Sequence, residues 1–476
     1  MLKTKEKSSL TDGPIFTRLL TYVLPIILTG ILQVAYNMAD NVVVGRYSGD
    51  PNALGSVGST ATFATLIVNL LIAFASGAGV VIAQFYGAKN DREVSRTVHT
   101  TMAISIIGGF GLMALSFALA IPILNFMGTQ EVFFDGALLY MRIICIGIPA
   151  SSIYNFGASV LRSVGDSKTS LYILSASGLV NVALNLVFVC LFGMSVDGVA
   201  LATIISQYLS AIAVVVVLMK RRGTSYQLSL KKLCLEARLV KRIMRIAIPI
   251  AVQTTLFSIS NMVIMMAVNT FPPAVVSAKT IAFNVEGITY TTMNSYQTAA
   301  MTFVGQNWGA QKYRRINKVA LYAVLQVAAL GILISQIEIF FGAELSSMYI
   351  EPGDPNKAAI VEAVLDIFAI MLATYFLCGI METLSGVLKG LGYSTISMIA
   401  CLIGLAVRVF WILVVTPTER FHTIFGLFVA YTISWLVTIA LLVGCVLYAW
   451  HKLGIFKRAR LEKLNENENI KENIKV

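Results

Sequence analysis

The sequence predicts an all-α polytopic membrane protein, with twelve transmembrane helices in two six-helix lobes related by a pseudo-twofold axis. Three observations lead to this prediction: the apolar composition, the length of the apolar stretches and an internal repeat. Hydrophobic residues make up 57% of the 476 residues and charged residues 13%, whereas soluble domains contain about 45–50% apolar and about 25% charged residues. So little charge cannot cover a water-soluble body of this size, which excludes an ordinary soluble enzyme and a disordered protein.

The apolar stretches have the length of membrane-spanning helices. A helix needs about 20 apolar residues to cross a bilayer, and several stretches exceed that length, which predicts tilt or extension beyond the hydrocarbon. Segments such as "SAIAVVVVLM" from Ser210 are continuously apolar, so they do not show the alternation of a membrane β-barrel. In chain order, the predicted spans are 18–44, 53–86, 97–124, 133–161, 169–192, 196–219, 243–270, 276–306, 317–341, 358–388, 394–415 and 421–450.

The basic residues predict the orientation of these spans. Thirty Lys and Arg residues fall in the two ends of the chain and in the loops on one side, and three fall in the opposite loops, namely Arg46, Lys357 and Arg420. Because short cytoplasmic loops are enriched in Lys and Arg, the N-terminal segment (1–17) and the tail (451–476) are both predicted to be cytoplasmic. The net charge of +12 therefore indicates insertion topology and contact with anionic lipid, not a nucleic-acid partner.

The sequence offers little support for cofactor, metal or enzyme chemistry. The six cysteines lack a CxxC pair and the three histidines lie far apart, so neither set predicts a metal site. The phosphate-loop pattern GxxxxGKS/T does not occur, which argues against ATP use, and no convergent nucleophile or acid-base cluster predicts an enzyme. The first apolar stretch carries Gln33, Asn37 and Asp40 and lacks a small-residue cleavage pattern, so we expect no cleaved signal. We also expect no cofactor.

The two halves of the chain repeat each other at an offset of 222 to 228 residues. The repeat predicts two lobes, 18–219 and 243–450, joined by a basic cytoplasmic linker at 220–242. Each half has an even number of spans, so the two lobes share one orientation about an axis along the membrane normal. By analogy, two such lobes around a central cavity indicate an alternating-access transporter. The matched segments are Pro25 with Pro249, Asn37 with Asn261, "QFYGAKNDR" (84–92) with "QNWGAQKYR" (306–314), "VLRSVGDS" (160–167) with "VLKGLGYS" (387–394), Gly198 with Gly426 and Ser206 with Ser434.

These segments resemble the multidrug and toxic compound extrusion (MATE) family over about residues 15–450. The resemblance rests on "PIILTGILQVAYNMADNVVVG" in span one, "GAGVVIAQFYGAKN" at the end of span two, "VLRSVGDSKTS" after span four, "NVALNLVFV" in span five, "GVALATIISQ" in span six and "YTISWLVT" in span twelve. In the second half, "METLSGVLKGLGYS" is most similar to bacterial members. The resemblance implies twelve helices in two lobes, a bacterial cytoplasmic membrane, and export of organic, commonly cationic, compounds against an inward Na⁺ or H⁺ gradient.

Polar residues of the first lobe form the predicted site of cation or proton coupling. Gln33, Asn37 and Asp40 lie at i, i+4 and i+7, so they share one face of span one. A charge at bilayer depth costs about 2.5–3.5 kcal/mol, which makes Asp40 the leading candidate. The other members are Asn37 beside it, Asn155 in span four, Asn181 and Asn185 in span five, and Thr203 in span six.

The family resemblance implies that Asp40, Asn181 and Thr203 match an ion or proton site of the first lobe, with Asn185 standing where a second carboxylate is usual. One carboxylate with amide and hydroxyl oxygens suits a single monovalent cation, and a buried Asp40 can equally take a proton. Both Na⁺ and H⁺ therefore stay open. The alternative is that these Asn and Thr side chains only hydrogen-bond across helices.

The predicted substrate cavity draws its acids from other positions in the second lobe, because Ile264 stands there where Asp40 stands in the first. Glu286 lies about 15 Å into span eight at 1.5 Å per residue. Arg408 is predicted to pair with Glu286 or Glu382, either as a structural ion pair or as part of a functional site. The cavity residues that we predict are Gln33, Tyr36, Glu286, Glu382 and Arg408.

Three further charges, Lys279, Asp366 and Glu338, are predicted to snorkel to the outer surface. The overall prediction is a monomeric secondary active antiporter, in which Na⁺ or H⁺ binding at Asp40 drives export of cationic or amphipathic organic compounds. The alternative is a flippase of related fold for a lipid-linked precursor. Such a flippase would line its cavity with several Arg and Lys residues, whereas only Arg142, Lys279 and Arg408 lie within spans.

Overall fold

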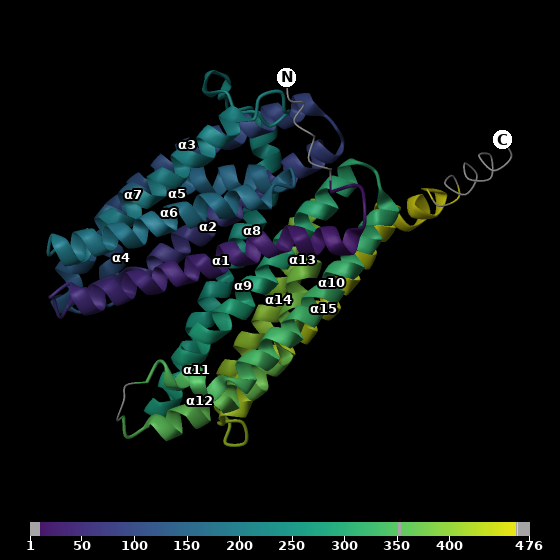
Figure 1. The fold of residues 1–476 in the computed structure, drawn as a ribbon. Coiled ribbons are helices and arrows are strands. Elements are labelled where there is room, and N and C mark those ends of the chain that lie inside the picture. Colours follow the sequence, from purple (N-terminus) through teal and green to yellow (C-terminus); the bar gives the residue numbers. More distant parts are fainter. Residues whose placement is uncertain (1–9, 351–353, 463, 465–476) are drawn as a thin grey trace. The chain divides into compact units, whose positions relative to one another are not determined.

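The computed structural model describes residues 10–350, 354–462 and 464, and every regular element in that part of the chain is helical (Figure 1). In the first half, helices lie at all six predicted spans. The fifth span ends in a π-helical turn, and the predicted third span, 97–124, is divided between a long helix and a short one. The elements are α1 (Ile15–Tyr47), α2 (Ala53–Gly87), α3 (Asp91–Ala118), α4 (Ala120–Phe126), α5 (Glu131–Ser163), α6 (Ser167–Asn185) with its π turn (Leu186–Leu191), and α7 (Val196–Lys220).

The second half repeats this order after a short 3-10 turn (Leu230–Lys232) in the basic linker. One predicted span differs: the apolar stretch 358–388 folds as two helices joined by a 3-10 turn rather than as one helix. The elements are α8 (Ala237–Val268), α9 (Pro273–Gly309), α10 (Tyr313–Phe340), α11 (Gly342–Ser347), α12 (Lys357–Met371), the 3-10 turn (Leu372–Thr374), α13 (Tyr375–Gly390), α14 (Ser394–Phe410) with a π turn (Trp411–Val415), and α15 (Ile424–Lys452).

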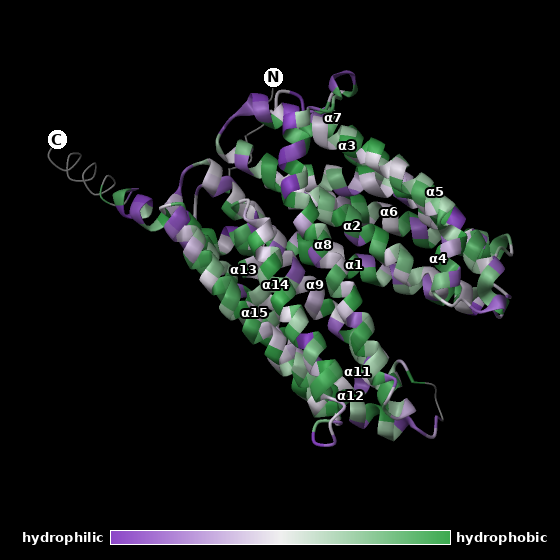
Figure 2. Cartoon of the chain, turned by 180° about the vertical axis from the view of Figure 1, so that it is seen from behind, coloured by the Kyte–Doolittle hydropathy of each residue, from purple (hydrophilic) through white to green (hydrophobic). Residues whose placement is uncertain are grey.

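Eleven helical segments of the described chain are long and apolar enough to cross a membrane, with α12 and α13 counted together. The remaining long helix, α9, has 37 residues, which is about 55 Å at 1.5 Å per residue. It carries Lys279, Glu286 and many hydroxyl and amide side chains, which lower its hydropathy. Figure 2 shows apolar residues along the helices and hydrophilic residues mainly at their ends. The predicted all-α membrane fold with twelve transmembrane helices is confirmed.

Two compact units divide the chain inside helices rather than at loops. The N-unit is residues 24–251, and the C-unit combines the described residues up to Val23 with those from Val252 on. The first turns of α1 therefore belong to the C-unit and the first turns of α8 to the N-unit. The lobes predicted from the repeat, 18–219 and 243–450, begin at other positions, because apolarity locates spans but not the packing partners of a helix end.

Each unit is built around the fourth long helix of its half. In the N-unit, α5 packs against α2, α3 and α7, and Met102, Leu161 and Leu218 meet there in a buried apolar cluster. In the C-unit, α13 packs against α9, α10 and α15. Gly386 of α13 lies against the backbone carbonyl of Gln297, where a Cβ atom would collide. Small residues let membrane helices approach this closely.

The backbone repeats its unusual positions at the same offset as the sequence. Lys89 and Gln311 both have positive φ, 54° and 58°, and each is the last residue of a repeated segment, "QFYGAK" or "QNWGAQ". Few non-glycine residues adopt this conformation, so the turn geometry is shared as well as the sequence. Gly165 and Gly392 match in the same way, with φ of 92° and 87°. Both fifth helices, α6 and α14, end in a π turn.

In each unit, a glutamine of a repeated segment accepts a hydrogen bond from a residue near the start of a helix that continues into the other unit. In the N-unit, Gln84 Oε1 accepts a hydrogen bond from Arg242 of α8 at 2.7 Å. In the C-unit, the equivalent Gln306 Oε1 accepts one from the backbone N–H of Leu10, which precedes α1, at 3.2 Å. A pair of glutamines that the repeat aligns thus anchors one helix start in each unit.

Candidate functional site

The N-unit brings Asp40, Asn185 and Thr203 together from three helices. Asn185 Nδ2 donates to Asp40 Oδ1 at 2.5 Å. The Thr203 hydroxyl lies near the Asp40 carboxyl and donates to the Val199 carbonyl of its own helix at 2.9 Å. Asn185 is fully buried and is the last residue of α6 before the π turn. π turns often occur at functional sites because they re-aim the side chains beside them. Spans one, five and six therefore meet here at a single carboxylate.

The remaining predicted members of this site lie around that contact without joining it. Asn181 is buried one turn before Asn185 on the same face of α6. Asn155 Nδ2 donates to the Ser151 carbonyl of its own helix at 2.9 Å, so its amide is occupied within α5. Asn37 is exposed one turn before Asp40.

Two predicted cavity residues of α1 lie on the stretch that precedes Asp40. Gln33 is exposed. The Tyr36 hydroxyl donates to the Ser175 carbonyl of α6 at 3.2 Å, and its ring lies directly against Gly178, which has no side chain to obstruct it. These contacts fix α1 against α6 one turn away from the Asp40 carboxyl.

The oxygen of the Asn185 amide has no hydrogen-bond partner in the described chain although it is buried. A buried polar atom without a partner costs about 1–3 kcal/mol, so such an atom calls for an explanation. With the amide NH₂ donated to Asp40, this oxygen is the one acceptor of the group left unused. A rotation of the amide would direct an oxygen toward a cation bound at Asp40.

The C-unit holds a second group of buried charges. Lys279 Nζ and Glu286 Oε1 lie 3.8 Å apart, both on α9 and both about 95% buried. They are seven residues apart, which places them on one helix face. Lys279 Nζ and Glu286 Oε2 have no hydrogen-bond partner in the described chain. The ion pair is therefore loose, and each partner keeps unused hydrogen-bonding capacity.

The predicted snorkelling of Lys279 and Glu338 is wrong. Both side chains are 5% exposed, and Glu338 Oε2 accepts from the Thr289 hydroxyl of α9 at 2.7 Å. Asp366 is exposed, as predicted. Distance from a helix end gives the depth of a residue but not the side of the helix on which it lies. Here the polar face of α9 is turned into the unit.

The predicted pairing of Arg408 with Glu286 or Glu382 is also wrong. Arg408 instead donates to Ser434 Oγ from Nε at 3.0 Å and from a terminal nitrogen at 2.9 Å, and among the described residues it forms no ion pair with either acid. Glu286 already has Lys279 on its own helix, and Glu382 accepts a hydrogen bond from Gln297 Nε2. Each acid therefore has a nearer partner than Arg408.

Aromatic rings, which the sequence did not single out, surround the two buried cations. The Arg408 guanidinium lies 4.5 Å from the centre of the Tyr431 ring, and Lys279 Nζ lies 6.0 Å from that same ring and 4.9 Å from that of Phe283. Cation–π contacts of this kind stabilise a buried positive charge. The repeat matched Ser434 to Ser206 but gave no sign that Ser434 would bind Arg408. In the described residues, no group of His, Cys, Asp or Glu could hold a metal ion.

Comparisons with known proteins find relatives over most of the chain. The family model described as MatE matches residues 25–187 and 249–413, one match in each half. "Probable multidrug resistance protein YoeA" of Bacillus subtilis is 27% identical over 445 residues, which cover 91% of this chain and 94% of that protein. "Probable multidrug resistance protein NorM" of Thermotoga maritima is 24% identical over 393 residues, covering 81% and 82%.

Solved structures share this fold at low sequence identity. One, described as the outward-facing conformation of a multidrug resistance MATE family transporter, aligns with a TM-score of 0.84 and 19% identity over 97% of this chain and all of that one. Another, a MOP superfamily transporter from Pyrococcus furiosus described as having a binding pocket of reverse polarity, aligns with a TM-score of 0.84 and 18% identity over 94% and 98%.

Proposed function

We propose that this chain, which belongs to the MatE family, is a secondary active antiporter that exports organic cationic or amphipathic compounds in exchange for Na⁺ or H⁺. The observation that carries the proposal is the contact of the Asp40 carboxyl with Asn185 and Thr203 inside the N-unit. In the described chain no ion pair joins Asp40 to a basic residue, and ionisable residues within membrane spans mark ion pathways and proton relays. The names of its relatives, which include multidrug resistance proteins, support the substrate class.

Coupling in this proposal is a competition for Asp40. When the site is empty, the Asn185 amide NH₂ occupies one carboxylate oxygen. A bound Na⁺ or H⁺ removes the need for that donor, so the amide rotates and its buried oxygen gains a partner. Only a ligand that binds the two states of a transporter differently can shift their balance. The Asn185 rotation provides such a difference.

The C-unit cluster is the proposed contact for the substrate. Glu286 has a carboxylate oxygen without a hydrogen-bond partner in the described chain. The rings of Phe283 and Tyr431 lie near its ion-pair partner Lys279. An acid in an aromatic environment attracts an organic cation. Glu382 lies on α13, buried and bonded to Gln297. We place the protein in a bacterial cytoplasmic membrane as a monomer with both ends in the cytoplasm, in line with the distribution of Lys and Arg.

Efflux from proteoliposomes tests this function. Vesicles that contain the protein and a fluorescent organic cation are given an inward Na⁺ gradient or an inward pH gradient, imposed separately. The proposal predicts that one gradient accelerates efflux at least severalfold over vesicles without a gradient. The proposal would be contradicted if the efflux rate were the same with the Na⁺ gradient, with the pH gradient, without a gradient and in protein-free vesicles.

The second candidate is a flippase for an anionic, lipid-linked compound. It is favoured by one observation: two buried cations, Lys279 and Arg408, lie beside the Tyr431 ring. The same vesicles report on it through translocation of a fluorescent anionic lipid, measured by dithionite quenching. Lipid translocation that Lys279→Gln reduces, without any cation efflux, would favour the flippase.

A further inference from the structure

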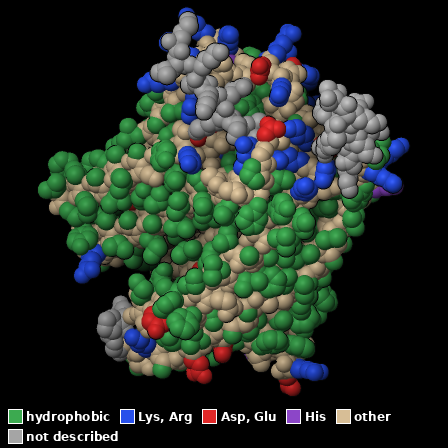
Figure 3. Space-filling model, turned by 45° about the vertical axis from the view of Figure 1, so that its right-hand side comes forward, with side chains coloured by type: hydrophobic (Ala, Val, Ile, Leu, Met, Phe, Trp, Pro, Cys, Tyr) green, Lys and Arg blue, Asp and Glu red, His purple; other side chains and the backbone are tan. Residues whose placement is uncertain are grey.

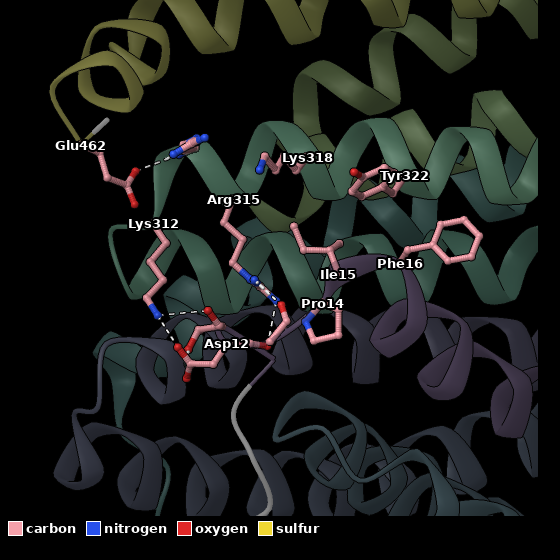
Figure 4. A pocket seen from close by; sticks show the side chains of 12 residues that line it. Asp12, Pro14, Ile15, Phe16, Lys312, Arg315, Lys318, Tyr322 and Glu462 are labelled. Atoms are coloured by element: carbon pink, nitrogen blue, oxygen red, sulfur yellow. Dashed lines mark hydrogen bonds and ion pairs between the residues drawn. The ribbon is translucent and has the colours of Figure 1, made fainter. Parts of the chain in front are cut away.

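A cavity of about 560 Å³ lies in the C-unit between the segment before α1 and the start of α10 (Figure 4). We call residues 11–16 the strap. The strap forms one wall, residues 312–322 form the other, and Glu462 lies at the rim. The cavity therefore joins three parts of the chain that are far apart in sequence. None of its residues belongs to the Asp40 site or to the buried charges of the C-unit.

The cavity carries more positive than negative charge. Lys312, Arg314, Arg315 and Lys318 line it, against Asp12 and Glu462. Lys312 Nζ pairs with Asp12 Oδ1 at 2.6 Å, which neutralises one cation and, through that hydrogen bond, holds the pKa of Asp12 below its usual range. Two more cations than anions therefore line this small space.

Arg315 and Lys318 form no ion pair with another residue of the described chain. Arg315 donates to the backbone carbonyls of Gly13 at 2.7 Å and of Asp12 at 2.9 Å, and these acceptors are neutral. Lys318 is exposed and has no ion pair or hydrogen bond to another residue of the described chain. A cationic wall that is already held in place loses little freedom when an anion binds.

The opposite side of the cavity is apolar and continues along α10. Phe16 and Tyr322 meet edge to face, with ring centres 6.2 Å apart. Leu321 and Leu325 follow Lys318 at i+3 and i+7, so they lie on the same helix face, and they are 56% and 53% exposed. This helix face carries a lysine at one end and exposed leucines beyond it. It therefore matches a ligand with a charged head and apolar chains better than it matches a free ion. Figure 3 shows hydrophobic side chains covering the flanks of the helices, with Lys and Arg gathered toward helix ends.

We propose that this cavity binds the phosphate group of an anionic phospholipid, with Arg315 and Lys318 facing the phosphate and the acyl chains lying along Leu321 and Leu325. The distribution of Lys and Arg predicts that this end of the C-unit is cytoplasmic. Basic pockets between membrane helices on that side bind anionic headgroups. The strap runs into the first turn of α1, so a bound lipid would hold that helix start against the C-unit.

Native mass spectrometry of the purified full chain tests the proposal. The protein is titrated with phosphatidylglycerol, with phosphatidylcholine and with inorganic phosphate, each alone and in competition. Phosphatidylglycerol is expected to bind more tightly than phosphatidylcholine. Lys318→Gln should weaken phosphatidylglycerol binding on the order of fivefold, the effect of one charge near a membrane surface. Lys231→Gln, an exposed lysine of the linker, is the matched control and should leave it unchanged.

A variant that is expected to change lipid binding in the opposite direction separates the electrostatic effect from damage to the fold. Asp12→Asn removes a negative charge from the cavity and frees Lys312, so it should tighten phosphatidylglycerol binding while Lys318→Gln weakens it. Equal binding of the two lipids, or an equal loss in Lys318→Gln and Lys231→Gln, would overturn the proposal. Displacement of the lipid by inorganic phosphate at similar concentration would also overturn it, because the ligand would then be a soluble phosphate.

Discussion

The Asp40 contact shows how one residue type decides what a membrane site can do. Sequence spacing placed Asp40 on a helix face, and the apolar stretches located the helices that carry Asn185 and Thr203. Asn185 stands where the family resemblance implies a second carboxylate. Its Nδ2 reaches Asp40 Oδ1 at 2.5 Å, so this position is in direct contact with Asp40. Whether the single oxygen of the Asn185 amide finds a partner depends on side-chain rotation, and no sequence pattern specifies that rotation.

Asn185→Asp is expected to strengthen cation or proton binding at this site. Two carboxylates this close do not both stay charged unless a proton or cation lies between them. The coupling-ion concentration that gives half-maximal efflux should therefore fall about tenfold or more, which corresponds to about 1.4 kcal/mol. Asn181→Asp, one turn away, is the control. A similar fall of this concentration in both variants would show that any added negative charge in the region has the effect, whether or not it contacts Asp40.

The Lys279–Glu286 pair makes a prediction about stability. Glu286→Gln leaves Lys279 charged and buried without a partner, a change that costs about 3–5 kcal/mol in buried pairs. The midpoint of thermal unfolding in detergent should fall accordingly. The double variant Lys279→Gln/Glu286→Gln removes both charges and should recover most of the loss. A double variant no more stable than the single one would show that the pair does not hold the charge of Lys279.

At the scale of elements, apolar length predicted where helices lie better than where they break. The part "IFAIMLATYFLCGI" (367–380) has no charged residue, so nothing in its hydropathy marks the 3-10 turn at Leu372–Thr374. The packing of α13 against α9, α10 and α15 involves residues distant in sequence. The inward face of α9 was missed for the same reason, because its burial depends on neighbouring helices.

The strap predicts a response to acid. The Lys312 hydrogen bond lowers the pKa of Asp12 below the ordinary value of 3.8. The stabilisation from this pair is therefore present above that value and is lost as the pH falls through the lower pKa of the folded state. Hydrogen exchange of residues 10–16, corrected for the intrinsic effect of pH, should stay constant from pH 7 to about pH 4 and rise below it.

A charge-removing variant tests the same contact at neutral pH. Lys312→Gln should raise hydrogen exchange in the strap about two- to fivefold, since exposed ion pairs contribute about 0.2–1 kcal/mol. Lys318→Gln removes a lysine of the same cavity that has no contact with the strap in the described chain, and it should leave exchange unchanged. If both variants, or neither, raised exchange, the Asp12–Lys312 pair would not be what holds the strap.

At the scale of the whole molecule, the repeat is the most informative feature of the sequence. It predicted two halves with the same order of helices, and the family model matches once in each half. The positive φ angles of Lys89 and Gln311 repeat as well. The charges do not repeat: Asp40 lies in the N-unit alone, and the Lys279–Glu286 pair lies in the C-unit alone. An exchanger that binds one ligand in each half needs this division.

Gradient-driven efflux by Asp40→Asn tests the coupling role most directly. Proteoliposomes loaded with a fluorescent cation are compared with and without the coupling gradient, and Asp366→Asn, which removes an exposed acid of α12, serves as the control. We predict that Asp40→Asn still exchanges substrate down its own gradient but is no longer accelerated by Na⁺ or H⁺, whereas Asp366→Asn behaves as the wild type does. Full acceleration in Asp40→Asn would contradict the account.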